Sequence, residues 1–280
     1  MNDDGSDVAI PDTAAANGAD SNALFISKTI HNLRDVGGLV TDSGGKVRSG
    51  VLFRSAQLGE RNDDALKQLT ALDLEIVFDL RSDDEVNRLP DFVPDGVTHV
   101  QLDVLADSEE RIAAQLEDLF VDPLGASELL MSGVVHDHYV GTYRNFVNLQ
   151  SAGSSYSQLF TSVAQGHRAL FHCTAGKDRT GWAAASLQLL LGVSQHDVIE
   201  HFLMSNPHTL ALFGAVMDAF VEAGGNPDAL APVFMVDRMY LEAAMEEVDS
   251  NFGSIENYFV EGLGLGHDGV AELRRRLIQE

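Results

Sequence analysis

The sequence predicts an α/β fold in which helices flank a short parallel sheet. The run "EIVFDLRS" at 75–82 is apolar and bounded by charge, which is typical of a buried parallel strand. Further strands are predicted at 97–104, "VTHVQLDV", and at 168–173, "RALFHC". The segments between and after these strands carry apolar residues at helical spacing. Strands that alternate with helices in this way favour an α/β domain. Neither an internal repeat nor a Pro/Ser-rich linker divides the chain, so we predict one domain over 23–280.

The N-terminal part begins with a segment of different composition. Residues 1–22 are rich in Asp, Asn, Gly and Ala, which predicts a disordered acidic tail. Residues 32–57 are expected to form short extended pieces joined by Gly-rich turns, with a hairpin loop at 42–45. A helix is predicted at 61–74, where leucines recur at helical spacing behind two aspartates that favour a helix start.

The rest of the chain predicts mostly helices. Residues 108–120 and 127–150 both carry apolar side chains at i, i+3 and i+4. The helix predicted at 180–192 ends at a glycine, and Ser194 resembles the start of a capping box for the next helix. The remaining predicted helices are 196–206, 210–224, 236–250, 255–263 and 269–280.

The segment from Cys173 to Arg179 carries the strongest chemical pattern, because a predicted strand precedes it and a helix follows it. Such a junction turns backbone N–H groups inward at a helix N-terminus and so binds anions. Gly176 permits a positive φ, and Arg179 could clamp two phosphate oxygens. The same donors would keep Cys173 as a thiolate near neutral pH, which favours a nucleophile over an inert buried cysteine.

The neighbouring side chains suggest the remaining roles. His172 could brace the loop, and the Thr180 hydroxyl could donate to the sulfur when it leaves. Asp178 is the candidate that protonates the leaving oxygen and then activates water. Lys177 adds a cation for developing charge or for a second substrate phosphate. The predicted phosphate-binding set is Thr174, Ala175, Gly176, Lys177, Asp178 and Arg179.

The stretch "HCTAGKDRTG" resembles the signature of the Cys-X5-Arg phosphatases, and more narrowly that of bacterial tyrosine phosphatases of the HCxxGKDRTG type. The stretches "NLRDVGGL", "VLFRSAQL", "VFDLRSDDEV", "DRMYLEAAMEEV" and "IENYFVEGLGL" are also similar to that family, so the resemblance covers about residues 28–280. It implies the tyrosine phosphatase α/β fold with a helical lid within 104–165. It also implies Cys173 as nucleophile, Arg179 as phosphate binder, Asp178 as acid and base, and Lys177 as an aid to phosphoinositide-type substrates.

The general acid remains open among three carboxylates. Other tyrosine phosphatases place this acid on a Trp-Pro-Asp loop, but the chain's only tryptophan, Trp182, is followed by alanine. This absence favours Asp178, while Asp79 and Asp103 stay as alternatives. Arg34, Asp35, Arg54 and Arg81 could face the site or have structural and ion-pair roles instead.

Charge and composition limit the partners. A net charge of −25 repels nucleic acid, so no nucleic-acid partner is expected and an anionic substrate must meet a local positive pocket. Apolar runs are too short for an integral membrane segment. One cysteine excludes an intrachain disulfide, and no metal or cofactor is expected.

The N-terminus lacks a Sec-type signal pattern, which favours a cytoplasmic location and leaves leaderless secretion open. A monomer is favoured, and the oligomeric state stays open.

The expected function is therefore a protein tyrosine phosphatase that acts through a cysteinyl-phosphate intermediate. Its partner would be a phosphorylated protein, with phosphoserine, phosphothreonine and phosphoinositides also possible substrates. Alternatives are an inositol phosphate or phosphoinositide phosphatase, a catalytically silent phosphate-binding module, and a sulfurtransferase. The run Lys177–Asp178–Arg179 argues against the last, because a persulfide carrier needs no acid for a leaving oxygen.

Overall fold

A sheet of five strands forms the centre of the computed structural model, which describes residues 29–59, 62–108 and 121–280. The strands β3, β6, β4 and β5 are parallel, and β1 pairs antiparallel with β3. Their order and bounds are β1 (Arg34–Asp35), β3 (Leu52–Ser55), β6 (Ala169–His172), β4 (Ile76–Asp79) and β5 (Thr98–Gln101). The predicted short parallel sheet is confirmed, with an antiparallel edge strand added. The predicted tail at 1–22 lies outside the described residues.

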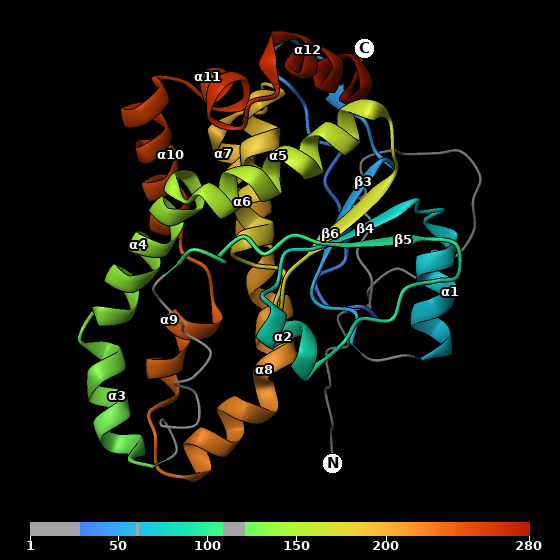
Figure 1. The fold of residues 1–280 in the computed structure, drawn as a ribbon. Coiled ribbons are helices and arrows are strands. Elements are labelled where there is room, and N and C mark those ends of the chain that lie inside the picture. Colours follow the sequence, from blue (N-terminus) through green and yellow to red (C-terminus); the bar gives the residue numbers. More distant parts are fainter. Residues whose placement is uncertain (1–28, 60–61, 109–120) are drawn as a thin grey trace, which may run out of the picture.

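Helices cover both faces of this sheet. Val77 and Leu170 pack on one face with Leu69 of helix α1 (Asp63–Ala71), whereas Phe78 and Phe171 belong to the larger core on the other face. Figure 1 shows α1 on one side of the strands and α5 and α6 on the other. Because successive side chains of a strand point to opposite faces, a buried parallel strand must be apolar on both. This explains the uninterrupted apolar runs of the sequence.

The other elements have these bounds: α2 (Asp83–Arg88), α3 (Pro123–Met131), α4 (Val134–Asn148), α5 (Gln150–Gln165), α6 (Arg179–Leu190), α7 (Gln195–Leu203), α8 (Ser205–Glu222), η3 (Pro227–Leu230), α9 (Ala231–Phe234), α10 (Arg238–Phe252), α11 (Ile255–Asn257), η4 (Tyr258–Gly262) and α12 (Gly266–Leu277). The short strands β2 (Lys46–Val47) and β7 (Ile278–Gln279) pair antiparallel. The hairpin predicted at 42–45 is present, since Val40 bridges Lys46 across it.

The structure differs from the predicted helices in three places. The pattern at 127–150 is divided between α3 and α4, because Gly133 adopts the left-handed region with φ +95°. Helix α5 was not predicted, since its sequence is rich in Ser and Gly; buried residues such as Tyr156 and Phe160 hold it in the core. Helix α8 begins at Ser205, ahead of the predicted start, because Pro207 is tolerated in a first turn. Most of the helix predicted at 108–120 lies outside the described residues.

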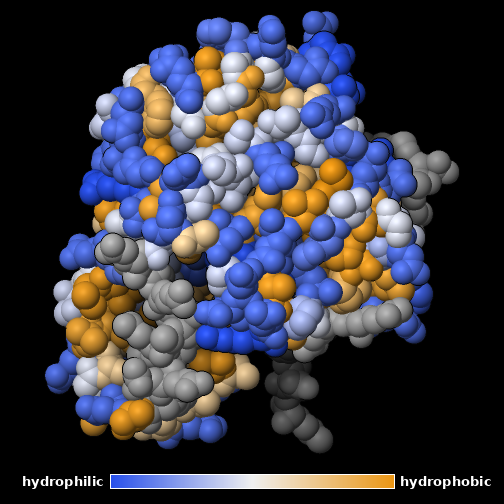
Figure 2. Space-filling view, viewed as in Figure 1, coloured by the Kyte–Doolittle hydropathy of each residue, from blue (hydrophilic) through white to orange (hydrophobic). Residues whose placement is uncertain are grey.

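A separate apolar cluster forms where α3, α8, η3 and α9 meet, with Leu130, Phe220 and Phe234 among its buried members. Figure 2 shows hydrophobic residues among hydrophilic ones on this face, some of them at its lower left over α3. Helix α3 carries three exposed large apolar side chains, Leu124, Leu129 and Met131. Among the described residues, no helix is both long and apolar enough to cross a membrane.

The sheet places one loop at the centre of its carboxyl edge. His172, the last residue of β6, has Ser55 as its register partner on one side and Asp79 on the other. Cys173 follows directly, so the loop it begins lies between the ends of β3 and β4. Side chains at the carboxyl ends of parallel strands thus converge on this loop, which is where open α/β sheets bind ligands.

Candidate active site

The loop from Cys173 to Arg179, called the phosphate loop below, connects β6 to the N-terminus of α6. It turns at Gly176, which has φ +66°. A Cβ atom at Gly176 would lie 2.1 Å from the carbonyl oxygen of Ser55. The loop therefore needs glycine here both for its backbone conformation and for its close approach to β3.

Two side chains from the N-terminal part of the chain hold the back of this loop. Asn32 Nδ2 donates to the carbonyl oxygens of Ala175 at 3.0 Å and Gly176 at 2.9 Å, and Arg54 Nη2 donates to the Gly176 oxygen at 2.6 Å. In a trans peptide the C=O and the following N–H point in opposite directions, and the described residues contain no cis peptide. The N–H groups of Gly176 and Lys177 therefore point to the opposite side, where an anion would bind.

Two buried guanidinium groups lie behind the phosphate loop. Arg54 is fully buried, and burial lowers its pKa to about 10, although Cys173 and Asp178 act in the opposite direction. Arg34 is also buried, and its Nη2 donates to the His201 carbonyl at 3.1 Å and to Ser205 Oγ at 3.0 Å. These cations create the local positive field that an anionic substrate requires in a chain with net charge −25.

Cys173 is buried, with 2% of its surface exposed. His172 Nδ1 lies 3.2 Å from the Cys173 carbonyl oxygen, so the imidazole contacts the loop backbone. Thr180 Oγ1 is buried and, within the described part of the chain, has no hydrogen-bond partner. A donor role of this hydroxyl toward the sulfur stays a prediction.

Arg179 is held by a residue that the sequence analysis did not single out. Glu85 of α2 accepts from Nη1 and Nη2 of Arg179 at 2.7 Å each, and it also accepts a short hydrogen bond from the Thr174 hydroxyl. Burial favours a raised pKa of the Glu85 carboxyl, but the charge and hydrogen bonds of Arg179 outweigh it and hold the pKa well below its usual range. The carboxylate therefore stays ionised and fixes the guanidinium plane. The spacing Ser82-x-x-Glu85 indicates a capping box, which the structure contains, but it does not indicate the contact with Arg179.

Lys177 and Asp178 form an ion pair at the start of α6 and contact helix α4. Lys177 Nζ lies 3.2 Å from Asp178 Oδ2 and 4.4 Å from the ring centroid of Tyr139, whereas Tyr143 Oη donates to Asp178 Oδ1 at 3.1 Å. Burial opposes the charge on Lys177, but Asp178 and Tyr139 outweigh it and raise the lysine pKa. Two tyrosines from the predicted lid region thus hold these side chains.

The two alternative acids differ in their surroundings. Asp79 is buried and accepts from Arg81 Nε at 2.9 Å and Nη2 at 2.8 Å, so its carboxylate is already paired with a guanidinium. Asp103 accepts from the Leu105 amide at 2.9 Å, and burial raises its pKa while the charge of Arg179 lowers it. A raised pKa suits a general acid, so Asp103 stays an alternative to Asp178.

The remaining candidates have mainly structural contacts. Asp35 accepts from the amides of Gly37 at 2.7 Å and Gly50 at 2.6 Å, which makes it a turn-stabilising residue. Arg81 pairs with Asp79 and Asp91 and does not reach the phosphate loop through any of its hydrogen bonds. Arg34 supports the phosphate loop indirectly. Its Nη1 donates to Asn32, which in turn donates to the loop carbonyls.

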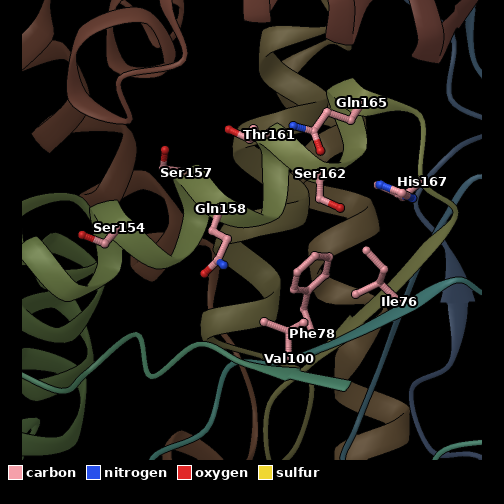
Figure 3. A pocket seen from close by; sticks show the side chains of 10 residues that line it. All are labelled: Ile76, Phe78, Val100, Ser154, Ser157, Gln158, Thr161, Ser162, Gln165 and His167. Carbon is pink, nitrogen blue, oxygen red and sulfur yellow. The ribbon is translucent and has the colours of Figure 1, made fainter. Parts of the chain in front are cut away.

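A cavity of about 570 Å³ lies between α5 and the strands β4 and β5 (Figure 3). Its floor is apolar, with Ile76, Phe78 and Val100, and hydroxyl and amide side chains of α5 such as Ser157 and Gln158 line its other side. None of its lining residues belongs to the phosphate loop. The cavity is thus separate from the candidate active site.

A parallel strand, a loop with Cys173 at one end and Arg179 at the other, and a helix N-terminus together make up the arrangement expected of a phosphatase. The tyrosine phosphatase family matches residues 26–279, and the chain belongs to this family. It is accordingly a protein-tyrosine phosphatase, and the resemblance to bacterial tyrosine phosphatases is confirmed.

Individual relatives agree with this assignment. The chain is 31% identical to a Cupriavidus necator protein with the provisional name tyrosine-protein phosphatase, over 95% of this chain and 92% of that protein. It is 28% identical to the Mycobacterium tuberculosis triple specificity protein phosphatase PtpB, over 88% of this chain and 96% of that protein. A tyrosine-protein phosphatase of Nostoc commune is 30% identical over 54% of this chain and 47% of its own length.

Proposed function

We propose that the chain hydrolyses phosphate monoesters through a phosphate group bound covalently to Cys173. The observation that carries the proposal is the orientation of the phosphate loop, whose carbonyls bind Asn32 and Arg54 so that its amides point the other way. Arg179, held by Glu85, retains its Nε–H and one further N–H on Nη2 for phosphate oxygens. The loop thus offers a ring of donors around the point that the Cys173 sulfur would attack.

The reaction has two steps. The Cys173 thiolate attacks phosphorus, an S–P bond forms, the ester P–O bond breaks, and the leaving oxygen takes a proton from Asp178. In the second step Asp178 takes a proton from water, whose oxygen attacks phosphorus while the S–P bond breaks. The thiolate returns and inorganic phosphate leaves, and the buried Thr180 hydroxyl could donate to the departing sulfur.

Phosphotyrosine in proteins is the first substrate that we propose. The name of the M. tuberculosis relative states triple specificity for that protein, which supports testing phosphoserine, phosphothreonine and phosphoinositides as further substrates here. Lys177 supports the second candidate, an inositol phosphate or phosphoinositide phosphatase, because its ammonium could meet an additional phosphate. Phosphotyrosine peptides and phosphoinositides should be compared side by side at matched concentrations.

The mechanism is tested by hydrolysis of p-nitrophenyl phosphate with EDTA present, comparing wild type with Cys173→Ser. We expect hydrolysis by wild type and none above background by the variant. Undiminished hydrolysis by Cys173→Ser would exclude the covalent mechanism.

The general acid is tested separately. Asp178→Asn should lose more activity on alkyl phosphates than on p-nitrophenyl phosphate, since a good leaving group needs less protonation. Equal losses on both substrates would count against Asp178 as the acid.

A further inference from the structure

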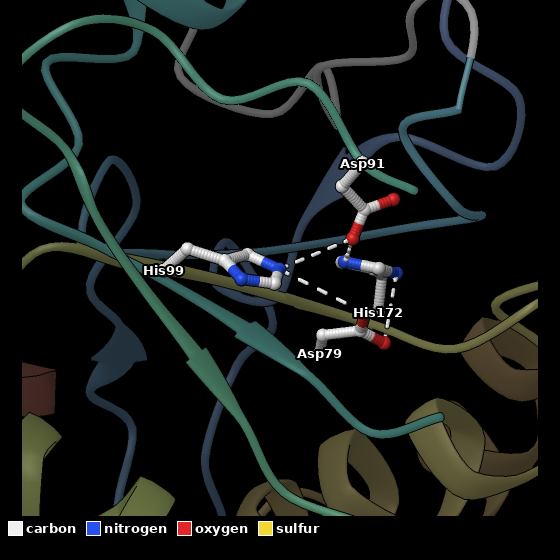
Figure 4. Close-up of side chains that lie close together, drawn as sticks. All are labelled: Asp79, Asp91, His99 and His172. Atoms are coloured by element: carbon white, nitrogen blue, oxygen red, sulfur yellow. Dashed lines mark hydrogen bonds and ion pairs between the residues drawn. The ribbon is translucent and has the colours of Figure 1, made fainter. Parts of the chain in front are cut away.

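A partly exposed histidine on the edge strand faces a buried ionic cluster. His99 lies in β5, the last strand of the sheet, and 33% of its side-chain surface is exposed. Its Nε2 atom is 3.3 Å from Asp91 Oδ2 and 3.8 Å from Asp79 Oδ2, and both carboxylate side chains are buried. Figure 4 shows the His99 imidazole directed at these two carboxylates, with His172 beside them. One nitrogen or oxygen atom of each of the four residues lies within 4.8 Å of the others.

Arg81 supplies this cluster with one positive charge. Its Nη2 atom lies 2.8 Å from Asp79 Oδ2 and 2.9 Å from Asp91 Oδ2, and its side chain is fully buried. Two buried carboxylates thus face one guanidinium, and buried carboxylates require counter-charges. A protonated His99 supplies the second positive charge from the exposed side of the cluster. A metal ion at the same place would meet the guanidinium charge at close range, so the cluster favours a protonated histidine over a metal ion.

The neighbours of His99 favour its protonated form. The contact with Asp91 raises the pKa of His99 above its ordinary value, and the charge of Asp79 acts in the same direction, whereas burial and the charge of Arg81 oppose the rise. These three residues are the charged groups that face the ring. Because the pKa is raised, the ion pair is complete below the ordinary value of about 6.5 and is lost as the pH rises through the pKa of the folded chain.

Asp91 also holds the chain segment next to the phosphate loop. Its Oδ1 atom accepts from the Leu58 amide at 2.8 Å, and the Phe92 amide donates to the Leu58 carbonyl at 3.0 Å. The preceding residue, Gln57, donates its amide to the Thr174 carbonyl of the phosphate loop at 3.1 Å. A displacement of Asp91 therefore reaches the loop through two adjacent residues, Leu58 and Gln57, that follow β3.

We propose that His99 is a positioning residue for the reaction. Its protonated ring anchors Asp91 to β5, and Asp91 in turn fixes residues 57–58 and with them Thr174 of the phosphate loop. The observations that carry the proposal are the two distances from Nε2 to buried carboxylates and the hydrogen bonds that connect Asp91 with Thr174. The proposal rests on hydrolysis at the phosphate loop, as proposed above, and adds a pH dependence that originates outside that loop.

The first test measures the protonation of His99 without turnover. The ring ¹³C and ¹H NMR signals of His99, assigned by comparison with His99→Gln, should titrate in wild type with a midpoint above the ordinary value of about 6.5. The midpoint should fall in Asp91→Asn, because the carboxylate that favours the proton is gone. A wild-type midpoint at or below the ordinary value would overturn the proposal. This result is independent of the Cys173→Ser hydrolysis test, so failure of the proposal and failure of the proposed function can be told apart.

The second test follows kcat/KM for p-nitrophenyl phosphate as a function of pH in wild type and His99→Gln. The ratio of the two values cancels the ionisations of the active site itself, which both proteins share. We expect wild type to exceed the variant by about fivefold at about pH 5.5, the upper range for a partly exposed ion pair, and the two to converge at about pH 9. If His99 only stabilised the fold, the free energy of unfolding would change, but this ratio would not vary with pH. A constant ratio in the folded variant would therefore overturn the positioning role.

His167→Gln is the matched control, because His167 Nδ1 lies 3.5 Å from Glu75 Oε1 in an exposed ion pair at the opposite edge of the sheet, before β4 and β6 begin. Its kcat/KM should follow that of wild type at every pH. His99→Lys keeps a positive charge over the whole range, so wild type should lose activity relative to this variant as the pH rises. If His99→Gln does not fold, as judged by circular dichroism, His99→Lys decides the question, and a constant ratio to wild type would again overturn the proposal.

Discussion

The carboxylate of Glu85 binds both Nη atoms of Arg179 at 2.7 Å and so fixes the plane of the guanidinium at the mouth of the phosphate loop. The same carboxylate accepts from Thr174, at the other end of the loop. One side chain of α2 therefore spans both sides of the loop. Because bidentate phosphate binding requires the guanidinium in one orientation, this contact pre-organises the site.

Glu85→Gln should weaken catalysis strongly while leaving the fold intact. The amide cannot accept from both Nη atoms, so Arg179 would gain rotational freedom and Thr174 would lose a charged partner. We expect kcat/KM for p-nitrophenyl phosphate to fall by about 100-fold, the cost typical of a misplaced catalytic group. The affinity for vanadate, measured by inhibition, should fall together with kcat/KM, measured by steady-state kinetics.

Asp84→Asn serves as the control for Glu85→Gln, since it removes a carboxylate from the same first turn of α2. Its kcat/KM should stay within about twofold of wild type, as is usual for substitutions on the surface. An equal loss of kcat/KM in both variants would indicate that activity depends on the total charge of α2 rather than on the contact between Glu85 and Arg179.

Stability should also depend on the ionisation of Glu85. Its pKa in the folded chain is held below the value of about 4.3 expected when unfolded. The ionised carboxylate therefore stabilises the fold fully above that pH, and this contribution decreases as the pH falls from there toward the lower pKa of the folded chain. The difference in free energy of unfolding between wild type and Glu85→Gln, from urea titrations, should shrink between about pH 6 and about pH 3. A pH-independent difference would contradict this assignment.

The sequence was sufficient to single out the segment from Cys173 to Arg179 as the candidate site, because Cys173, Gly176 and Arg179 lie within seven residues and follow a recognisable strand. It was not sufficient for Asn32 or Glu85, whose contacts with the loop are set by the order of strands in the sheet. Neither residue carries a local pattern that distinguishes a loop partner from a turn or a helix cap. Long-range packing decides these roles, as it also decides that the Ser-rich segment of α5 is helical.

Gly176→Ala should abolish activity through the loop backbone. Alanine would adopt the observed φ of +66° with strain, and its Cβ would meet the Ser55 carbonyl at 2.1 Å, so β3 or the loop would have to move. Gly192→Ala is the matched control, since Gly192 has φ +83° and open space around the new Cβ. The control should lose about 1 kcal/mol of unfolding free energy and keep its activity. Comparable activity in the two variants would show that the close approach to β3 is unimportant.

Lys177→Met should change substrate preference more than basal chemistry. The ammonium is held beside Asp178 and the Tyr139 ring, where a second substrate phosphate could approach it. We expect kcat/KM to fall by about tenfold more on a phosphoinositide than on p-nitrophenyl phosphate, the value of one charge-assisted contact. Lys67→Met, on the exposed face of α1, is the control and should affect neither substrate. Equal losses on both substrates would assign Lys177 to the chemistry common to both.

Asn32→Gly should show how strongly the phosphate loop depends on the hydrogen bonds that Asn32 donates to its carbonyls. Glycine accepts the φ of +58° that Asn32 adopts, so the backbone is not strained, but two hydrogen bonds to the loop carbonyls are lost. The carbonyl of Ala175 would be left without this buried donor, whereas the carbonyl of Gly176 keeps its hydrogen bond from Arg54.

We expect Asn32→Gly to lose about 1–3 kcal/mol in the free energy of unfolding. It should also bind vanadate more weakly, because the amides opposite these carbonyls lose their fixed direction. Urea unfolding and vanadate inhibition should be measured on the same preparations. Asn148→Gly, at the exposed end of α4 where Asn148 contacts α10, is the control for loss of an asparagine. If Asn32→Gly is destabilised but binds vanadate as tightly as wild type, Asn32 supports the fold without orienting the phosphate loop.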